Sequence, residues 1–205
     1  NNTQVGMTDN ITIANASKAN IDIGLVEKAI FNLQLDKTVS KITMQNNKTT
    51  KTNNFNNSKL AKVDVDGKQI NNTNLIIEYK IKITNEGTIP GYAKKIADDM
   101  PKELKFSSEL NKNWYISQGN QVINQSLSDI MIQPGESKEV TLVLTKKMTE
   151  NGNGVVNNKA SIQESYNEYG VENSEKITNE HKSADVIIGL KTGKTISYIS
   201  LIIAI

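Results

Sequence analysis

Apolar and polar residues alternate along two stretches of this chain, residues 31–42 and residues 75–84. A period of two predicts strands that bury one face and expose the other. The second stretch carries an apolar residue at every odd-numbered position. In the first stretch Lys37 shares its parity with the apolar residues Phe31, Leu33, Leu35 and Val39. We therefore expect the Lys37 side chain to point into the core.

Shorter apolar segments predict further strands at residues 92–98, 104–106, 140–144 and 155–162, the last of which completes the expected core. Turn-forming residues separate several segments, as in Asn85-Glu86-Gly87 and Gln133-Pro134-Gly135-Glu136. The polar residues 46–57 are expected to form a long exposed loop or hairpin tip. Short strands, frequent turns and no convincing helical period predict an all-β, antiparallel, immunoglobulin-like β-sandwich.

We divide the 205 residues into four parts. Residues 1–28 lack a sustained apolar period and are expected to be the tail of a preceding module with its linker. Residues 29–165 hold the predicted sandwich, and residues 166–193 are expected to be a membrane-proximal linker. Residues 196–205 are apolar but fewer than the roughly 20 residues that a membrane-spanning helix needs. We expect residues 194–205 to begin a truncated membrane anchor, with a terminal strand packed on the domain as the alternative.

Composition excludes several classes of function. The formal net charge is +2 and lysines are interspersed with acidic residues, so no basic patch for nucleic acid is expected. The chain has no cysteine, so a disulfide cannot cross-link it outside the cell. No phosphate-binding loop or nucleophile elbow occurs, and His181 lacks partners for a zinc site. We therefore expect no enzyme activity, no metal and no cofactor.

A lysine, an aspartate and an asparagine fall on inward-facing positions of three predicted strands. By alternation Lys37, Asp98 and Asn158 point inwards, whereas Asp99 and Asn157 point outwards. Burial populates the neutral, nucleophilic amine of a lysine. A buried carboxylic acid can polarise an asparagine carbonyl and pass protons to the departing ammonia. The three side chains can thus form a Lys–Asn amide in a single turnover.

Each of these residues also has an ordinary structural interpretation. An aspartate before Met100-Pro101 is commonly a turn cap, and an asparagine near a strand end is commonly a turn residue. The amine of Lys37 can reach solvent while its stem lies along apolar neighbours. Alternation alone leaves these interpretations open.

Several short motifs occur in the order typical of the DUF11 family. They are residues 77–87, Gly91-Tyr92-Ala93, Asp98-Asp99-Met100-Pro101, Leu104-Lys105-Phe106, Pro134-Gly135-Glu136 and Asn158-Lys159-Ala160. Residues 31–162 thus resemble a DUF11 domain, an immunoglobulin-like repeat of bacterial surface proteins. Such domains are similar to the CnaA-type domains of Gram-positive adhesins, in which a Lys, an Asp and an Asn build an intramolecular isopeptide bond.

This resemblance implies that Lys37 is the nucleophile, Asp98 the proton shuttle and Asn158 the acceptor of such a bond. Glu78 stands at a position that the family usually fills with threonine, and it is the reserve candidate for the acid.

The resemblance also implies a structural stalk module of a Gram-positive, clostridial-type surface protein. Its partners would be neighbouring repeat domains of the same chain and the membrane or cell wall, reached through the C-terminal segment. The alternative is an adhesive binding module, in which the loops at residues 43–57 or 114–121 hold a host protein or glycan. Trp114 is expected to plug the core with a solvent-exposed rim beside it.

Overall fold

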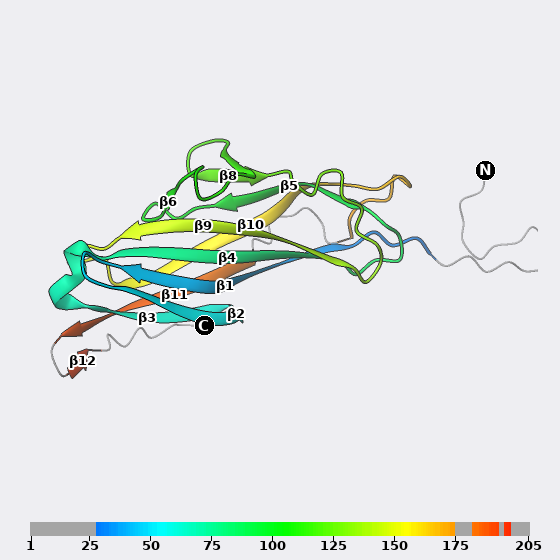
Figure 1. The fold of residues 1–205 in the computed structure, drawn as a ribbon. Coiled ribbons are helices and arrows are strands. Elements are labelled where there is room, and N and C mark those ends of the chain that lie inside the picture. Colours follow the sequence, from blue (N-terminus) through cyan, green and yellow to red (C-terminus); the bar gives the residue numbers. More distant parts are fainter. Residues whose placement is uncertain (1–27, 175–181, 193–194, 198–205) are drawn as a thin grey trace, which may run out of the picture.

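Two β-sheets face each other across an apolar interior in the computed structural model of this chain, which describes residues 28–174, 182–192 and 195–197 (Figure 1). The described residues also include one short 3₁₀ helix, η1 (Gly67–Asn72), which begins after Asp66, whose side chain accepts a hydrogen bond from the Lys68 amide. Neighbouring strands within the sheets are mostly antiparallel. The architecture is the all-β, immunoglobulin-like sandwich that the alternation predicts.

Sheet 1 has five strands in the order β2-β1-β4-β9-β6. Their bounds are β1 (Leu33–Gln45), β2 (Thr50–Ser58), β4 (Asn74–Asn85), β6 (Lys105–Phe106) and β9 (Ser137–Lys147).

Sheet 2 has seven strands, six of them in the order β12-β11-β10-β5-β8-β7. Their bounds are β5 (Tyr92–Asp99), β7 (Trp114–Ile116), β8 (Gln121–Asn124), β10 (Gly154–Tyr166), β11 (Lys182–Thr192) and β12 (Thr195–Ser197). The seventh strand, β3 (Leu60–Asp66), pairs in parallel with β11.

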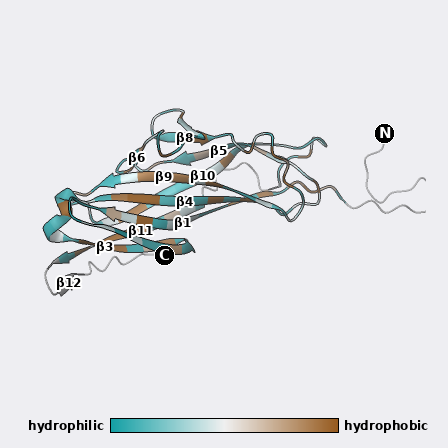
Figure 2. Cartoon of the chain, in the orientation of Figure 1, coloured by the Kyte–Doolittle hydropathy of each residue, from teal (hydrophilic) through white to brown (hydrophobic). Residues whose placement is uncertain are grey.

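The core lies between the sheets because alternate residues of each strand point inwards. Along β4 five consecutive odd-numbered side chains have no solvent exposure, namely Leu75, Ile77, Tyr79, Ile81 and Ile83. Figure 2 shows apolar and polar bands alternating along this strand. Because the ladder between β1 and β4 places Lys37 opposite Ile81, the lysine faces the same interior.

The predicted strands at residues 75–84, 92–98, 140–144 and 155–162 are confirmed as parts of β4, β5, β9 and β10. The long loop or hairpin tip expected at residues 46–57 is confirmed only as a hairpin tip at residues 46–49, because residues 50–58 form β2 at the edge of sheet 1. Most of its side chains are exposed. Backbone pairing with β1 holds this strand, so it needs no apolar alternation.

The sandwich extends beyond residue 165, where we placed its C-terminal boundary. Residues 182–192, expected within a linker, form β11, which pairs with β10 on one side and β3 on the other. The inward side chains of this strand, Ala184, Val186 and Ile188, are buried in the core. Strand β10 is therefore not the last strand of the domain. Apolar residues alternate in β11 as in other strands, but its pairing with β10 and with the distant β3 is a tertiary feature that no local pattern contains.

The expected N-terminal tail, apart from residue 28, and most of the expected anchor lie outside the described residues. Residues 195–197 of the expected anchor form β12, which pairs with residues 190–192 of β11. None of the segments that the structure describes forms a helix with the length and apolar content needed to cross a bilayer.

Candidate functional site

Lys37 projects from β1 into the space between the sheets. Leu35 and Val39 flank it on the same face of the strand, and the lysine has no solvent exposure. A slip of one residue in the ladder with β4 would turn this whole apolar face outwards. The packing of β1 therefore fixes the lysine inside, as the alternation predicts.

Asp98 and Asn158 enter the same interior from sheet 2. Asp98 lies on β5 opposite Ala160 of β10, and Asn158 precedes Ala160 by two positions on the same face. Both side chains have no solvent exposure. Residues in this diagonal relation are about 7–8 Å apart, so their side chains can meet. The two sheets thus bring together three residues that the sequence separates widely.

The polar atoms at this place are incompletely paired. Lys37 Nζ donates a hydrogen bond to Asp98 Oδ2 in a fully buried ion pair. Among the described residues, Asp98 Oδ1, the Tyr79 hydroxyl and both amide atoms of Asn158 have no hydrogen-bond partner. The only other such buried side-chain atom in the described part of the chain is Asp64 Oδ1. Since an unpaired buried polar group costs about 1–3 kcal/mol, this concentration marks a site rather than ordinary core packing.

Tyr79 completes what we call the buried cluster, formed by Lys37, Tyr79, Asp98 and Asn158. It lies on β4 opposite Val39, two positions along β1 from Lys37. The distance from Lys37 Nζ to the centroid of its ring is 4.7 Å. Sequence patterns identify Tyr79 only as a core residue of the central strand. The one available signal is its hydroxyl on an otherwise aliphatic strand face.

Burial changes the protonation preferences of the cluster. It lowers the pKa of the Lys37 amine, although the charge and hydrogen bond of Asp98 oppose this effect. It raises the pKa of the Asp98 carboxyl, although Lys37 and Asn158 oppose that effect. Both directions favour a neutral amine beside a protonated acid over an ammonium beside a carboxylate. Burial also raises the pKa of Tyr79 above its usual range, so its hydroxyl keeps its proton.

The arrangement has the parts that an amide exchange needs. A neutral amine is a nucleophile, a protonated acid can donate a proton, and an asparagine side chain supplies the carbonyl carbon. All three groups lie in a region without solvent exposure, where water does not compete with the amine.

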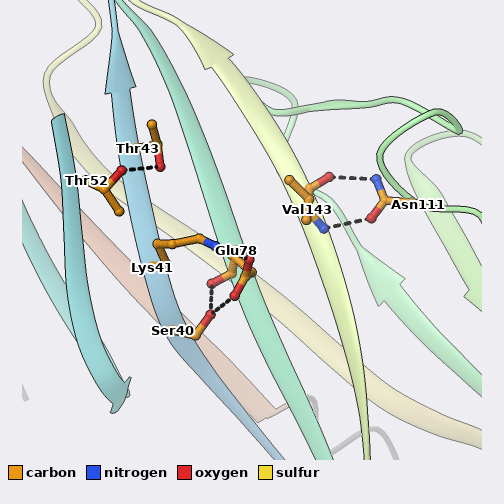
Figure 3. Close-up of polar contacts among 7 residues, drawn as sticks. All are labelled: Ser40, Lys41, Thr43, Thr52, Glu78, Asn111 and Val143. Carbon is orange, nitrogen blue, oxygen red and sulfur yellow. Dashed lines mark hydrogen bonds and ion pairs between the residues drawn. The ribbon is translucent and has the colours of Figure 1, made fainter. Parts of the chain in front are cut away.

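Glu78, the reserve candidate for the acid, does not belong to the buried cluster. Figure 3 shows its carboxylate beside Ser40 and Lys41 of β1. Ser40 Oγ donates to Glu78 Oε1 at 2.7 Å, and Lys41 Nζ lies 2.8 Å from Oε2. Partial burial alone would raise the pKa of Glu78, but hydrogen bonds from Lys41 and Ser40 lower it below its ordinary value. Glu78 alternates with the inward Ile77 and Tyr79, so its carboxylate lies on the outer face of sheet 1 and cannot serve the cluster.

Asp99 and Asn157, which alternation directs outwards, do point away from the buried cluster. Asn157 is exposed and donates a hydrogen bond to Asp185 on β11. Asp99 is half-buried and accepts a hydrogen bond of 2.8 Å from Gln121 Nε2. Each cluster residue on sheet 2 thus has an adjacent residue of the same type that points away, which supplies matched controls for mutagenesis.

The second of the two segments considered as a binding surface, residues 114–121, is anchored to the sandwich at its start. Trp114 is buried, and its indole nitrogen donates to the Thr141 carbonyl at 2.8 Å. The Asn111 side chain pairs with both backbone groups of Val143 on β9 at 2.8 Å, as Figure 3 shows. The adjacent Tyr115 is 46% exposed. The expectation of a tryptophan plug beside an exposed rim is confirmed.

In the part of the chain that the structure describes, no group of three or more His, Cys, Asp or Glu side chains is placed to hold a metal ion. His181 lies outside the described residues.

No protein-family model and no curated protein matches the chain. Among solved structures, the chain is similar to a crystal structure of the CARDB domain of the PF1109 protein from Pyrococcus furiosus in complex with di-metal ions. The identity is 13%, the TM-score is 0.37, and the match covers 81% of this chain and 100% of that chain. A solution NMR structure of the same domain matches at 15% identity with a TM-score of 0.29, covering 75% and 94% of the two chains.

Proposed function

We propose that this domain is a structural stalk module of a bacterial surface-anchored protein, closed by an autocatalytic amide bond between Lys37 and Asn158. One observation carries the proposal: a lysine, an aspartate and an asparagine from opposite sheets meet in a fully buried cluster. Four of its polar atoms have no hydrogen-bond partner among the described residues. The order of DUF11-like and CnaA-like motifs supports the same assignment.

The proposed reaction exchanges one amide for another. The neutral Lys37 Nζ attacks Cγ of Asn158, and the carbonyl oxygen takes up negative charge. The bond from Cγ to Nδ2 then breaks. Asp98 delivers its proton to Nδ2 and takes one from Nζ in its place, so ammonia leaves and the carboxyl ends in its starting form. The product is a Lys–Asn amide, and neither an oxidant nor a cofactor takes part.

The reaction also relieves the cost of the unreacted cluster. Holding an amine and a carboxyl inside the core is costly, because both polar groups lose their hydration. Bond formation replaces the amine and the carboxamide by a neutral amide. The unpaired Nδ2 of Asn158 leaves as ammonia. The departure of ammonia into solvent makes the bond effectively permanent.

A stalk domain benefits from a bond at this place. β1 belongs to sheet 1 and β10 to sheet 2, so the amide joins the two layers of the sandwich. We propose that force reaches the domain outside the cell, through neighbouring repeat domains and through membrane or wall attachment by the C-terminal segment. The chain has no cysteine for a disulfide, and an amide is insensitive to reductants.

Intact-protein mass spectrometry tests this function. The folded domain is expected to be lighter than its sequence mass by one ammonia. Lys37→Met keeps the unbranched stem of the side chain but removes the terminal amine that acts as nucleophile, and Asn158→Ala removes the acceptor. Both variants are expected to show the full sequence mass. A folded wild-type domain with the full sequence mass excludes the bond.

A further inference from the structure

The Tyr79 hydroxyl occupies an unusual position for a core tyrosine. Tyr79 has no solvent exposure, and within the described residues its hydroxyl has no hydrogen-bond partner. Core tyrosines normally pair this group. A phenylalanine at this place would keep the ring without burying an unpaired hydroxyl. The hydroxyl therefore calls for an explanation other than packing.

Tyr79 lies beside the groups that react in the proposed bond formation. Its ring lies 4.7 Å from Lys37 Nζ. The Asn158 carboxamide lies close enough to the hydroxyl to lower its pKa by a polar contact, against the larger opposite effect of burial. The two side chains enter from opposite sheets, Tyr79 from β4 and Asn158 from β10. Tyr79 thus contacts both partners of the proposed bond.

The proposed reaction needs a hydrogen-bond donor that Asp98 does not readily supply. A carboxamide is a poor electrophile, and attack by an amine places negative charge on its oxygen. Asp98 is occupied with Lys37 through Oδ2 and with proton transfer to the departing nitrogen. Two other buried amides, Asn85 and Asn111, donate to backbone carbonyls away from the cluster.

We propose that Tyr79 is a catalytic residue of the cross-linking reaction, whose hydroxyl donates a hydrogen bond to Oδ1 of Asn158 as this oxygen becomes an oxyanion. This inference rests on the proposed Lys37–Asn158 bond. Tyr79 donates a hydrogen bond and transfers no proton, so the balance of atoms and protons in the reaction does not change. Its ring also limits the positions open to Lys37 Nζ and keeps water from the amine. Within the tetrahedral intermediate, Asp98 then exchanges protons with the two nitrogens, and Tyr79 donates a hydrogen bond to the oxygen.

The decisive variant is Tyr79→Phe, which removes one oxygen atom and keeps the ring. Full-length protein made by pulse-labelled cell-free synthesis is quenched at increasing times, and intact mass gives the fraction that has lost ammonia. Tyr79→Phe is expected to react about 10²–10³-fold more slowly than wild type, as for loss of one oxyanion donor. The matched control is Tyr115→Phe, because Tyr115 is 46% exposed and its hydroxyl bonds to Gln125. This control is expected to react at the wild-type rate.

A second measurement separates catalysis from folding. In an Asn158→Ala background, where no bond can form, Tyr79→Phe is expected to leave the denaturant midpoint unchanged or raised. Slow reaction of Tyr79→Phe with an unchanged midpoint supports the inference. Reaction at the wild-type rate, or a lowered midpoint that accounts for slow reaction, overturns it and leaves the proposed bond standing. Absence of ammonia loss from wild type overturns both.

Discussion

Lys37 and Asn158 extend from strands of opposite sheets, β1 and β10, and both side chains are fully buried between those sheets. The two residues are 121 positions apart in the chain (158 − 37). An amide between them would enclose β2 to β9 in one covalent loop and would leave β11 outside it. This arrangement is expected to govern bond formation, the free energy of unfolding and the response of the domain to force.

Asp98→Asn is expected to block bond formation although both bonding partners remain. The asparagine keeps the shape of the carboxyl but cannot accept and return protons in the pH range of proteins. Intact mass is expected to show the full sequence mass of this variant. The control is Asp99→Asn on the half-buried neighbouring residue, which is expected to lose ammonia as wild type does. Complete cross-linking of Asp98→Asn would show that the acid has no role.

Asn158→Ala is expected to lower the free energy of unfolding substantially. By the entropy estimate developed for disulfides, closing a loop of this length stabilises the folded state by about 4–5 kcal/mol. Loss of the buried side chain adds to the effect. Asn157→Ala removes the same chemical group from an exposed neighbouring position, and its effect is expected to stay within about 0.5 kcal/mol. Urea unfolding monitored by circular dichroism measures both variants.

Alternation was sufficient to predict the inward direction of Lys37, Asp98 and Asn158, because the side-chain period of a strand is two and one face of each strand is buried. It also directed Asp99 and Asn157 outwards, and burial agrees. The contact between the three residues depends on how the two sheets stack, which no local pattern contains. The DUF11 resemblance supplied that relation as an expectation, and the structure brings the three side chains into one cluster.

Strands β2, β3, β7, β8 and β11 were not predicted, and neither was the place of Tyr79 in the cluster. β2 is polar apart from Phe55 because backbone pairing at the edge of sheet 1 holds it. β11 does alternate apolar residues, but its pairing with β3 and β10 is a tertiary feature that no local pattern contains. Tyr79 resembles its aliphatic neighbours in periodicity, so only the three-dimensional position of its hydroxyl sets it apart.

The Lys37–Asp98 pair is expected to make the unlinked domain least stable in the middle of the pH range. Burial lowers the pKa of Lys37 from its ordinary value of 10.5 and raises that of Asp98 from 3.8. As the pH falls, the folded Asp98 binds its proton before the unfolded one does, so acid favours folding through this group. As the pH rises, the folded Lys37 releases its proton before the unfolded one does, so alkali favours folding through this group.

Urea unfolding of Asn158→Ala between about pH 3 and pH 11 measures this dependence. The matched reference is Lys37→Met/Asp98→Asn, which is also unlinked and lacks both titrating groups. The difference between the two curves is expected to be lowest near neutrality and to rise towards both ends. A difference that falls towards acid or alkali would contradict these two pKa shifts.

Ile188→Ala is expected to destabilise the domain by about 2–5 kcal/mol, as for other buried isoleucines. Ile188 of β11 is 2% exposed and belongs to the core. Ile187→Ala removes the same atoms from the adjacent, half-buried position that points outwards, so its effect is expected to be clearly smaller. Equal and small effects in urea unfolding would restore the view that residues 166–193 form a linker outside the domain.

Single-molecule force spectroscopy is expected to separate the linked and unlinked domains by the length of chain that they release. Pulled from its two ends, the wild-type chain transmits force from β1 through the proposed amide to β10. Residues between Lys37 and Asn158 then cannot extend, whereas β11 lies outside the loop and can detach in either form. Asn158→Ala lacks this restraint and is expected to release an additional 121 residues (158 − 37), roughly 400 Å of extended chain. Wild type and Asn158→Ala of equal released length would show that no covalent bond joins the sheets. Asn157→Ala, handled in the same way, is expected to give the wild-type length, because the exposed amide takes no part in the bond.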